Sequence, residues 1–118
     1  MKLQIPRGES VFIGAPAVPM DSRRIQSLRE LVSRTRTVEE AHLPQCFIMG
    51  FTPKPAQVLV VMGHSLRKLR GELDGLEAEF SKVFAFPEYL DVWPLAMTDD
   101  MAQAVRDAHC QIFARTSR

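Results

Sequence analysis

The sequence predicts an α+β fold of the ferredoxin-like type, a split β-α-β-β-α-β order that forms an antiparallel four-stranded sheet with an extra C-terminal helix. Three observations predict it. Strand-like apolar runs alternate with helical patterns along the chain. The two continuous apolar runs, residues 11–13 and 58–62, fit the central strands one and three. Pro44 and Pro94 interrupt the other two expected strands, which suits sheet edges because proline donates no ladder hydrogen bond.

The first half of the chain begins with an expected strand at residues 10–14, followed by a proline-containing turn. Asp21 or Ser22 caps the first expected helix, because a short oxygen-bearing side chain accepts an otherwise unpaired backbone N–H. Residues 38–48 form the second expected strand, which Pro44 places at an edge or breaks with a bulge. Apolar residues of the helix recur at spacings of three and four: Ile25, Leu28, Leu31 and Val32.

The second half begins with the third expected strand, residues 58–62, the most apolar segment of the chain. His64 or Ser65 opens the second helix, and residues 90–97 form the fourth strand. An acid-rich cap at residues 98–100 starts a last helix that runs close to the C-terminus. The second helix carries the apolar stripe Leu66, Leu69, Leu73, Leu76, Phe80 and Val83, and the last helix carries Met101, Val105, Ala108 and Ile112.

The third strand is apolar on both faces. Side chains alternate along a strand, so Val58, Val60 and Met62 point one way and Leu59 and Val61 the other. Two helices cover one face of such a sheet, and large exposed apolar patches are uncommon on monomers. We therefore expect either the last helix or another subunit to cover the second face, which predicts a homodimer or a protein partner.

Length and composition predict one domain, residues 1–118. Fifteen basic and fourteen acidic residues leave a net charge of +1, so neither a DNA partner nor a membrane surface is expected. The N-terminus lacks the apolar core of a secretory signal, and no run has the length of a membrane span, which predicts a cytoplasmic protein. Cys46 and Cys110 show no metal-ligand spacing, so we expect reduced thiols, no metal and no cofactor.

Short segments in a fixed order resemble the C-terminal domain of the enhanced serine sensitivity (SseB) protein family. They are residues 11–14 with Pro16 and Pro19, then residues 38–43, and finally residues 112–115. The resemblance covers about residues 10–115 and identifies the chain as this domain standing alone. It implies a bacterial cytoplasmic protein of poorly defined function, and it transfers no active-site residues.

The candidates for catalytic residues each have a simpler structural interpretation. Gly63 and Ser65 match two positions of a nucleophile elbow, but Arg67 replaces the second glycine, so Ser65 is expected to be a helix cap. Adjacent helical residues do not face each other, which argues against a dyad of His109 and Cys110. We therefore predict no catalytic residue among these, nor in His42, His64, Asp99 or Asp100.

The arginines of the first helix are the strongest polar signal. Strand three offers no aromatic side chains and strand one only Phe12, so RNA binding through the sheet is not expected. The sequence favours a non-enzymatic interaction module that binds a protein partner or itself. The alternative is a binder of a small anionic ligand or phosphate, because guanidinium groups pair with carboxylate and phosphate oxygens. The candidate residues for either role are Arg23, Arg24, Arg29, Arg34 and Arg36.

Overall fold

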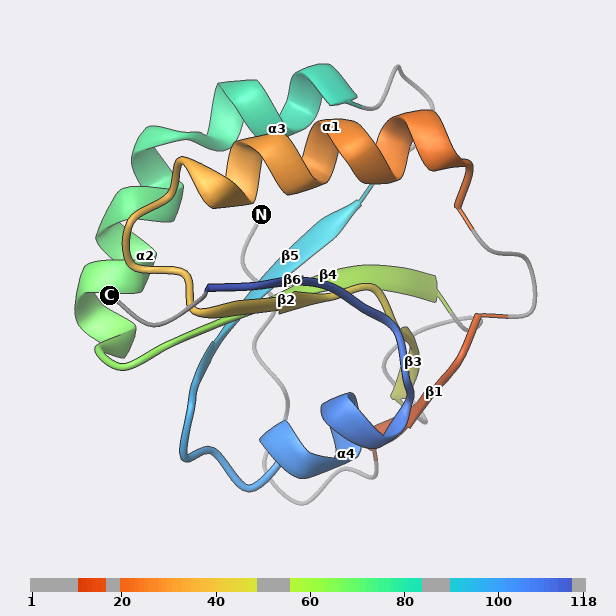
Figure 1. The fold of residues 1–118 in the computed structure, drawn as a ribbon. Coiled ribbons are helices and arrows are strands. Elements are labelled where there is room, and N and C mark those ends of the chain that lie inside the picture. The colour runs from red at the N-terminus through yellow and green to blue at the C-terminus, as the bar shows by residue number, and fades with distance from the viewer. Residues whose placement is uncertain (1–10, 17–19, 49–55, 84–89, 116–118) are drawn as a thin grey trace.

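Ten helices and strands follow one another in the described part of the chain (Figure 1). The structure is a computed structural model that describes residues 11–16, 20–48, 56–83 and 90–115. It confirms the α+β class. In chain order the elements are β1 (Val11–Gly14), α1 (Ser22–Ser33), β2 (Glu40–His42), β3 (Gln45–Ile48), β4 (Ala56–Gly63), α2 (Leu66–Gly75), α3 (Glu77–Val83), β5 (Asp91–Ala96), α4 (Ala102–Asp107) and β6 (Gln111–Ala114).

The long strand β4 organises the sheet. The hydrogen-bonded order is β1-β3-β4-β2-β6, and β5 pairs with β4 as a branch off this path. β4 and β5 are parallel, and the remaining pairs are antiparallel. Val60 of β4 lies beside His42 of β2 on one side and Trp93 of β5 on the other. In the described sheet β5, which contains Pro94, pairs with β4 alone, so the edge position predicted from this proline is confirmed.

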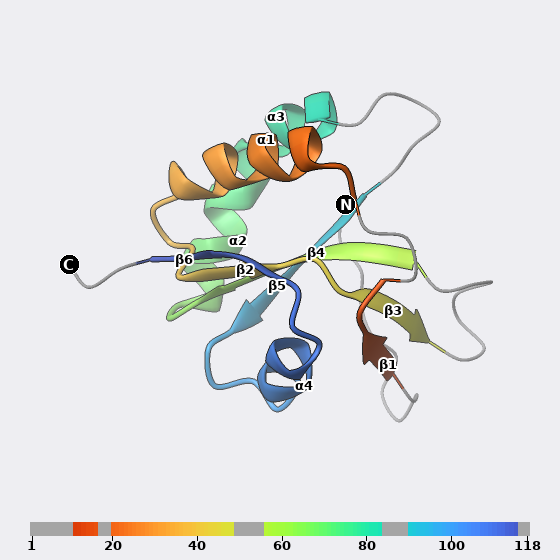
Figure 2. The same cartoon turned by 45° about the vertical axis from the view of Figure 1, so that its right-hand side comes forward.

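The predicted second strand is broken at Leu43 and Pro44 into β2 and β3, as one of the two alternatives for Pro44 foresaw. The backbone N–H of Leu43 donates to the carbonyl of Cys110 at 2.9 Å, just before β6, and Val58 donates to the carbonyl of Pro44 at 3.0 Å. Past this point the outer neighbour changes: β2 pairs with β6, whereas β3 pairs with β1. Figure 2 shows β3 and β1 curving away from the plane of β2 and β4.

The four-stranded, ferredoxin-like order is not what the described residues form, and the predicted central position of strand one is wrong. β1 lies at the end of the sheet order, next to β3 alone. Its apolar character has another cause, because Ile13 packs against buried residues on the α4 side of the sheet. An apolar strand therefore does not require two neighbouring strands.

The prediction that the last helix continues through Ile112 is also wrong. α4 ends at Asp107, and His109 adopts the left-handed conformation with a φ of 56°. This residue turns the chain, and the strand β6 that comes next pairs with β2. Ile112 and Phe113 pack against the buried residues under α1, which is why these positions are apolar.

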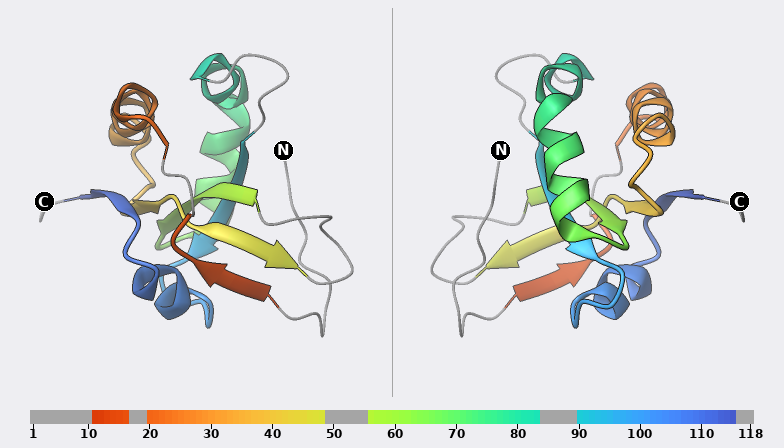
Figure 3. Two further views of the ribbon diagram at one scale, coloured as in Figure 1. Left: turned by 90° about the vertical axis from the view of Figure 1, so that its right-hand side faces the viewer. Right: turned by 90° about the vertical axis from the view of Figure 1, so that its left-hand side faces the viewer.

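Both faces of β4 are covered, so the sheet has two cores. Leu59 and Val61 are buried with side chains of α1, α2 and α3, whereas Val60 and Met62 are buried with Ala102 and Val105 from elsewhere. Those last two belong to α4, which lies on the opposite side of the sheet from α1, α2 and α3 (Figure 3). The predicted alternation is confirmed, and the last helix covers the second face.

The predicted second helix is divided into α2 and α3, because α2 ends at Gly75 and its C-cap Leu76 leaves the helical conformation.

No helix in the described ranges is long and apolar enough to cross a membrane.

Candidate functional site

Four of the residues considered for catalysis, namely Ser65, Asp99, Asp100 and His64, lie at or near the start of a helix or are exposed. The Oγ of Ser65 accepts the backbone N–H of Lys68 at 3.3 Å, which confirms the prediction that Ser65 caps a helix. The predicted acid-rich cap of the last helix is not formed, because the N-cap of α4 is Met101, which makes no side-chain cap hydrogen bond. Asp99 instead accepts the N–H of Met101 at 2.8 Å before the helix begins, while Asp100 and His64 are exposed. Among the described residues, no group of three histidine, cysteine or acidic side chains is placed to hold a metal ion.

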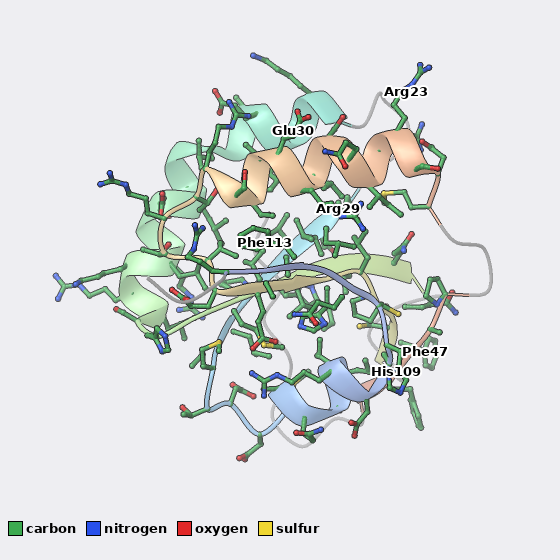
Figure 4. The ribbon with its side chains drawn as sticks, in the orientation of Figure 1. Arg23, Arg29, Glu30, Phe47, His109 and Phe113 are labelled. Carbon is green, nitrogen blue, oxygen red and sulfur yellow. The ribbon has the colours of Figure 1, made fainter. Side chains whose placement is uncertain are left out.

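The arginines of α1 point to different sides of the helix. Arg23 is exposed and points away from the sheet, whereas Arg29 points towards it (Figure 4). The Nε of Arg29 donates to the carbonyl oxygen of Ile112 in β6 at 2.9 Å. Arg24 lies 3.5 Å from the carboxylate of the helix cap Asp21. Arg29 is nevertheless an exposed residue, whereas Arg24 is half-buried.

Arg34 and Arg36 lie at the C-terminal end of α1. The Nε of Arg34 donates to the carbonyl of Glu30 at 3.3 Å, one helical turn earlier. The backbone N–H groups of Arg36 and Thr37 both donate to the carboxylate of Glu72 in α2 at 2.9 Å. Both arginine side chains belong to exposed residues. They are therefore separated from the Arg29 guanidinium by position and orientation.

A cavity of about 320 Å³ opens beside Arg29, and we call it the Arg29 pocket. It brings together three residues that the sequence analysis singled out separately, namely Arg29, His109 and Cys110. The described residues that line it are Ala15, Pro16, Met20, Ile25, Arg29, Leu43, Gln57, His109, Cys110, Gln111 and Ile112.

The Arg29 pocket forms because the sheet changes neighbours at the strand break. Gly14 at the end of β1 pairs with Gln45, and Cys110 before β6 bonds to Leu43, so two chain segments meet the broken strand from the same side. Between them the edge of the sheet is open. α1 roofs the opening and contributes its apolar and basic side chains. The break predicted from one proline thus creates the cavity.

Local hydrogen bonds hold the polar groups of the pocket. Beyond the bond from Arg29 to Ile112, the side-chain amide of Gln57 donates to the carbonyl of Leu43 at 3.1 Å. The Nη groups of Arg29 make no ion pair with a described carboxylate. Among the described residues that line the pocket, none is acidic. In the part of the chain that the structure describes, the positive charge of Arg29 therefore faces this cavity without a compensating negative charge.

Cys110 and His109 close the other end of the Arg29 pocket. The thiol of Cys110 donates to the carbonyl of Ala108 at 3.1 Å, and burial raises the pKa of this thiol. It therefore stays a neutral, weakly polar group near pH 7. His109 is exposed and holds its left-handed backbone conformation at the pocket rim.

A second polar group, which the sequence analysis missed, joins α4 to β2. We call Glu40, His42 and Arg106 the Glu40 cluster. Arg106 donates to both carboxylate oxygens of Glu40, at 3.0 and 2.8 Å, and the Nε2 of His42 lies 3.0 Å from the same carboxylate. These hydrogen bonds, led by the one from Arg106, lower the pKa of Glu40 despite partial burial. The spacing of Glu40 and His42 by two residues on a strand was the available signal.

The Glu40 cluster lines a separate cavity of about 420 Å³ with two glutamates and two arginines, Glu39, Glu40, Arg106 and Arg115. Charges of both signs therefore face it. The Nδ1 of His42 is buried without a hydrogen-bond partner among the described residues. The cluster joins α4 to β2, and the side chains of Glu40 and Arg106 are both partly buried.

An aromatic pair marks the β1 edge of the sheet. Phe12 is 54% exposed, and its ring centroid lies 6.3 Å from that of Phe47 in the paired strand β3. It is the one large apolar side chain found exposed in the described ranges. This surface lies on β1, away from the two cores.

No family model, no curated protein and no solved structure matches the chain. The resemblance to the SseB C-terminal domain therefore stays a prediction that rests on the quoted residues.

Proposed function

We propose that this chain is a non-enzymatic binding module that holds a small anionic ligand in the Arg29 pocket. The observation that carries the proposal is the guanidinium of Arg29, which faces a cavity without an acidic lining residue in the described structure. An uncompensated positive charge beside an apolar wall attracts an anion more strongly than it would in open water. The proposal narrows the arginine-based alternative of the sequence analysis to one of its five residues.

The test is a titration of the isotope-labelled chain with sodium acetate and with inorganic phosphate, followed by NMR. We expect saturable shifts at the amides of Arg29, Cys110 and Ile112 with at least one of the two anions. Arg29→Gln removes the charge and should weaken binding at least about tenfold. Arg23→Gln is the matched control, because Arg23 lies on the same helix but points away from the sheet. Equal affinity of the two variants overturns the proposal.

The loss of the bond to Ile112 complicates the reading of Arg29→Gln. Arg29→Lys separates the two effects, because lysine keeps the charge but lacks the planar fork. Retained anion binding in Arg29→Lys, together with reduced binding in Arg29→Gln, identifies the charge as the cause. A thermal unfolding curve for each variant shows what fraction of the protein is folded under the conditions of the titration.

A protein partner is the second candidate, and the exposed Phe12 favours it. β1 lies at the end of the described sheet order, and strand edges accept added strands through backbone hydrogen bonds. The original reason for a homodimer is weaker, because α4 covers the second face of β4. Phe12→Ser should then reduce self-association in sedimentation experiments over a wide concentration range. If the native chain and the Phe12→Ser variant are both monomeric at all concentrations, the proposal that the partner is a second copy of this chain is overturned.

A cytoplasmic location and a relationship to the SseB C-terminal domain belong to the same proposal. Cys46 and Cys110 are both free thiols, which fits a reducing compartment. Cell fractionation of the native host tests the location.

A further inference from the structure

The walls of the Arg29 pocket restrict the kind of anion that fits, and this inference rests on the proposed function. Three elements supply apolar side chains. Met20 comes from the residue before the cap of α1 and Ile25 from the start of that helix. Leu43 comes from the strand break and Ile112 from β6. All are buried or half-buried. A cavity of about 320 Å³ lies at the lower end of the range for small-ligand pockets, so the ligand is small and its body is apolar.

The polar groups of the pocket match one negative charge. Arg29 contributes the one guanidinium among the described lining residues, and its Nε already donates to the carbonyl of Ile112. The two Nη groups remain, and their N–H pair has the spacing of the two oxygens of a carboxylate. A phosphate dianion prefers several arginines or the free N-terminus of a helix. The carboxylate of Asp21 occupies the N-terminus of α1, where it accepts the N–H of Arg24 at 3.0 Å.

The remaining polar side chains do not compete for the anion. Burial keeps the Cys110 thiol protonated, and Gln57 and Gln111 are neutral. Among the described residues of the lining, Arg29 is therefore the one arginine or lysine, and it lies next to a mainly apolar surface.

We propose that the ligand of the Arg29 pocket is an apolar monocarboxylic acid, with its carboxylate on the Nη groups of Arg29 and its hydrocarbon part against Met20, Ile25, Leu43 and Ile112. The ligand is bound without a covalent step.

A homologous series of carboxylates tests this assignment directly. The probes are acetate, butyrate and hexanoate, measured by NMR titration or calorimetry on the whole chain. Affinity should rise about fourfold for each methylene that enters the pocket and then level off when the cavity is full. Benzoate and benzamide form a matched pair of similar shape, and the neutral amide should bind at least about tenfold more weakly.

Two variants locate the hydrocarbon part. Met20→Ala should weaken the binding of hexanoate about threefold to tenfold and leave acetate nearly unchanged. Met97→Ala is the control, because Met97 is equally half-buried but lines the cavity of the Glu40 cluster. An equal effect of the two variants on hexanoate overturns the assignment.

The outcomes separate this inference from the proposed function. Tighter binding of phenyl phosphate or inorganic phosphate than of benzoate and hexanoate overturns the monocarboxylate but leaves an anion-binding pocket. A flat affinity from acetate to hexanoate does the same. Failure of every anion in the panel to bind overturns both.

Discussion

Arg106 of α4 holds both carboxylate oxygens of Glu40 on β2, with Nε at 3.0 Å from one and Nη2 at 2.8 Å from the other. This fork is the polar counterpart of the apolar contact that Ala102 and Val105 make with β4. The residues lie 66 positions apart in the chain. The last described helix is therefore held against the sheet by two charge-assisted hydrogen bonds as well as by buried apolar contacts.

The Glu40 ion pair predicts a pH-dependent stability. Arg106 lowers the pKa of Glu40 from its usual 4.5, so the stabilisation is complete above about pH 4.5 and is lost as the pH falls through the lower folded-state pKa. Glu40→Gln should therefore cost about 2 kcal/mol at pH 7, and the difference from the native chain should shrink towards pH 3. Urea unfolding at both pH values measures it, with Glu79→Gln, an exposed site, as control. A deficit of the same size at both pH values contradicts the prediction.

Two glycines should respond to alanine in opposite directions. A Cβ at Gly63 would collide with the backbone carbonyl of Thr37, whereas a Cβ at Gly71 in α2 meets open space. Gly63→Ala should lower the free energy of unfolding by about 2 kcal/mol or more, since backbone must move. Gly71→Ala should raise it by about 1 kcal/mol, the helix propensity difference. Chemical denaturation of both variants provides the measurement, and two shifts of the same sign argue against this account.

His109 predicts a stabilising substitution at the rim of the Arg29 pocket. Its φ of 56° is strained for any residue with a Cβ, and its side chain is exposed. His109→Gly should therefore raise the stability by about 1 kcal/mol, while His109→Ala should not. The order of the melting temperatures, glycine above histidine and alanine, checks the prediction. Equal values for glycine and alanine would show that the turn carries no strain.

Ser65 should behave as a helix cap and as nothing else. Ser65→Ala removes the acceptor for the N–H of Lys68 and should cost about 1 kcal/mol of stability. The control is Ser33→Ala at the C-terminal end of α1, which should change stability by less than about 0.5 kcal/mol. A fluorophosphonate probe should leave the native chain unlabelled. Labelling that disappears in Ser65→Ala would instead identify a nucleophile.

Local signals predicted the elements whose cause is local. Asp21 and Ser65 cap the helices assigned to them, and the alternation along β4 divides its side chains between two cores as expected. Pro44 breaks its strand because it lacks an N–H. In each case the physical reason lies within a few residues of the chain.

Long-range contacts explain what the sequence could not predict. Ile112 fits a helical stripe after Met101 and Val105, but it belongs to a strand, because the left-handed turn at His109 redirects the chain. Likewise, Ile13 of β1 packs against the cluster that contains Ala102 and Val105 of α4. Its apolar side chain therefore did not indicate that β1 lies at the end of the sheet order.

The candidate site was predicted in fragments. Arg29 was one of five arginines, and nothing in their spacing distinguished the one that bonds to β6. Its approach to Cys110 depends on a strand that follows the last helix. Only the tertiary structure brings these positions into one pocket.

The contacts of Arg115 join the end of the described chain to the C-terminal end of α1. This residue, just past β6, donates to the carbonyls of Ser33, Thr35 and Val38, some 80 positions earlier in the chain. β6 also supplies Ile112 to the wall of the Arg29 pocket. The last described strand therefore completes the core under α1 and one wall of the Arg29 pocket at the same time. A change that loosens β6 would disturb the end of α1 and the pocket together.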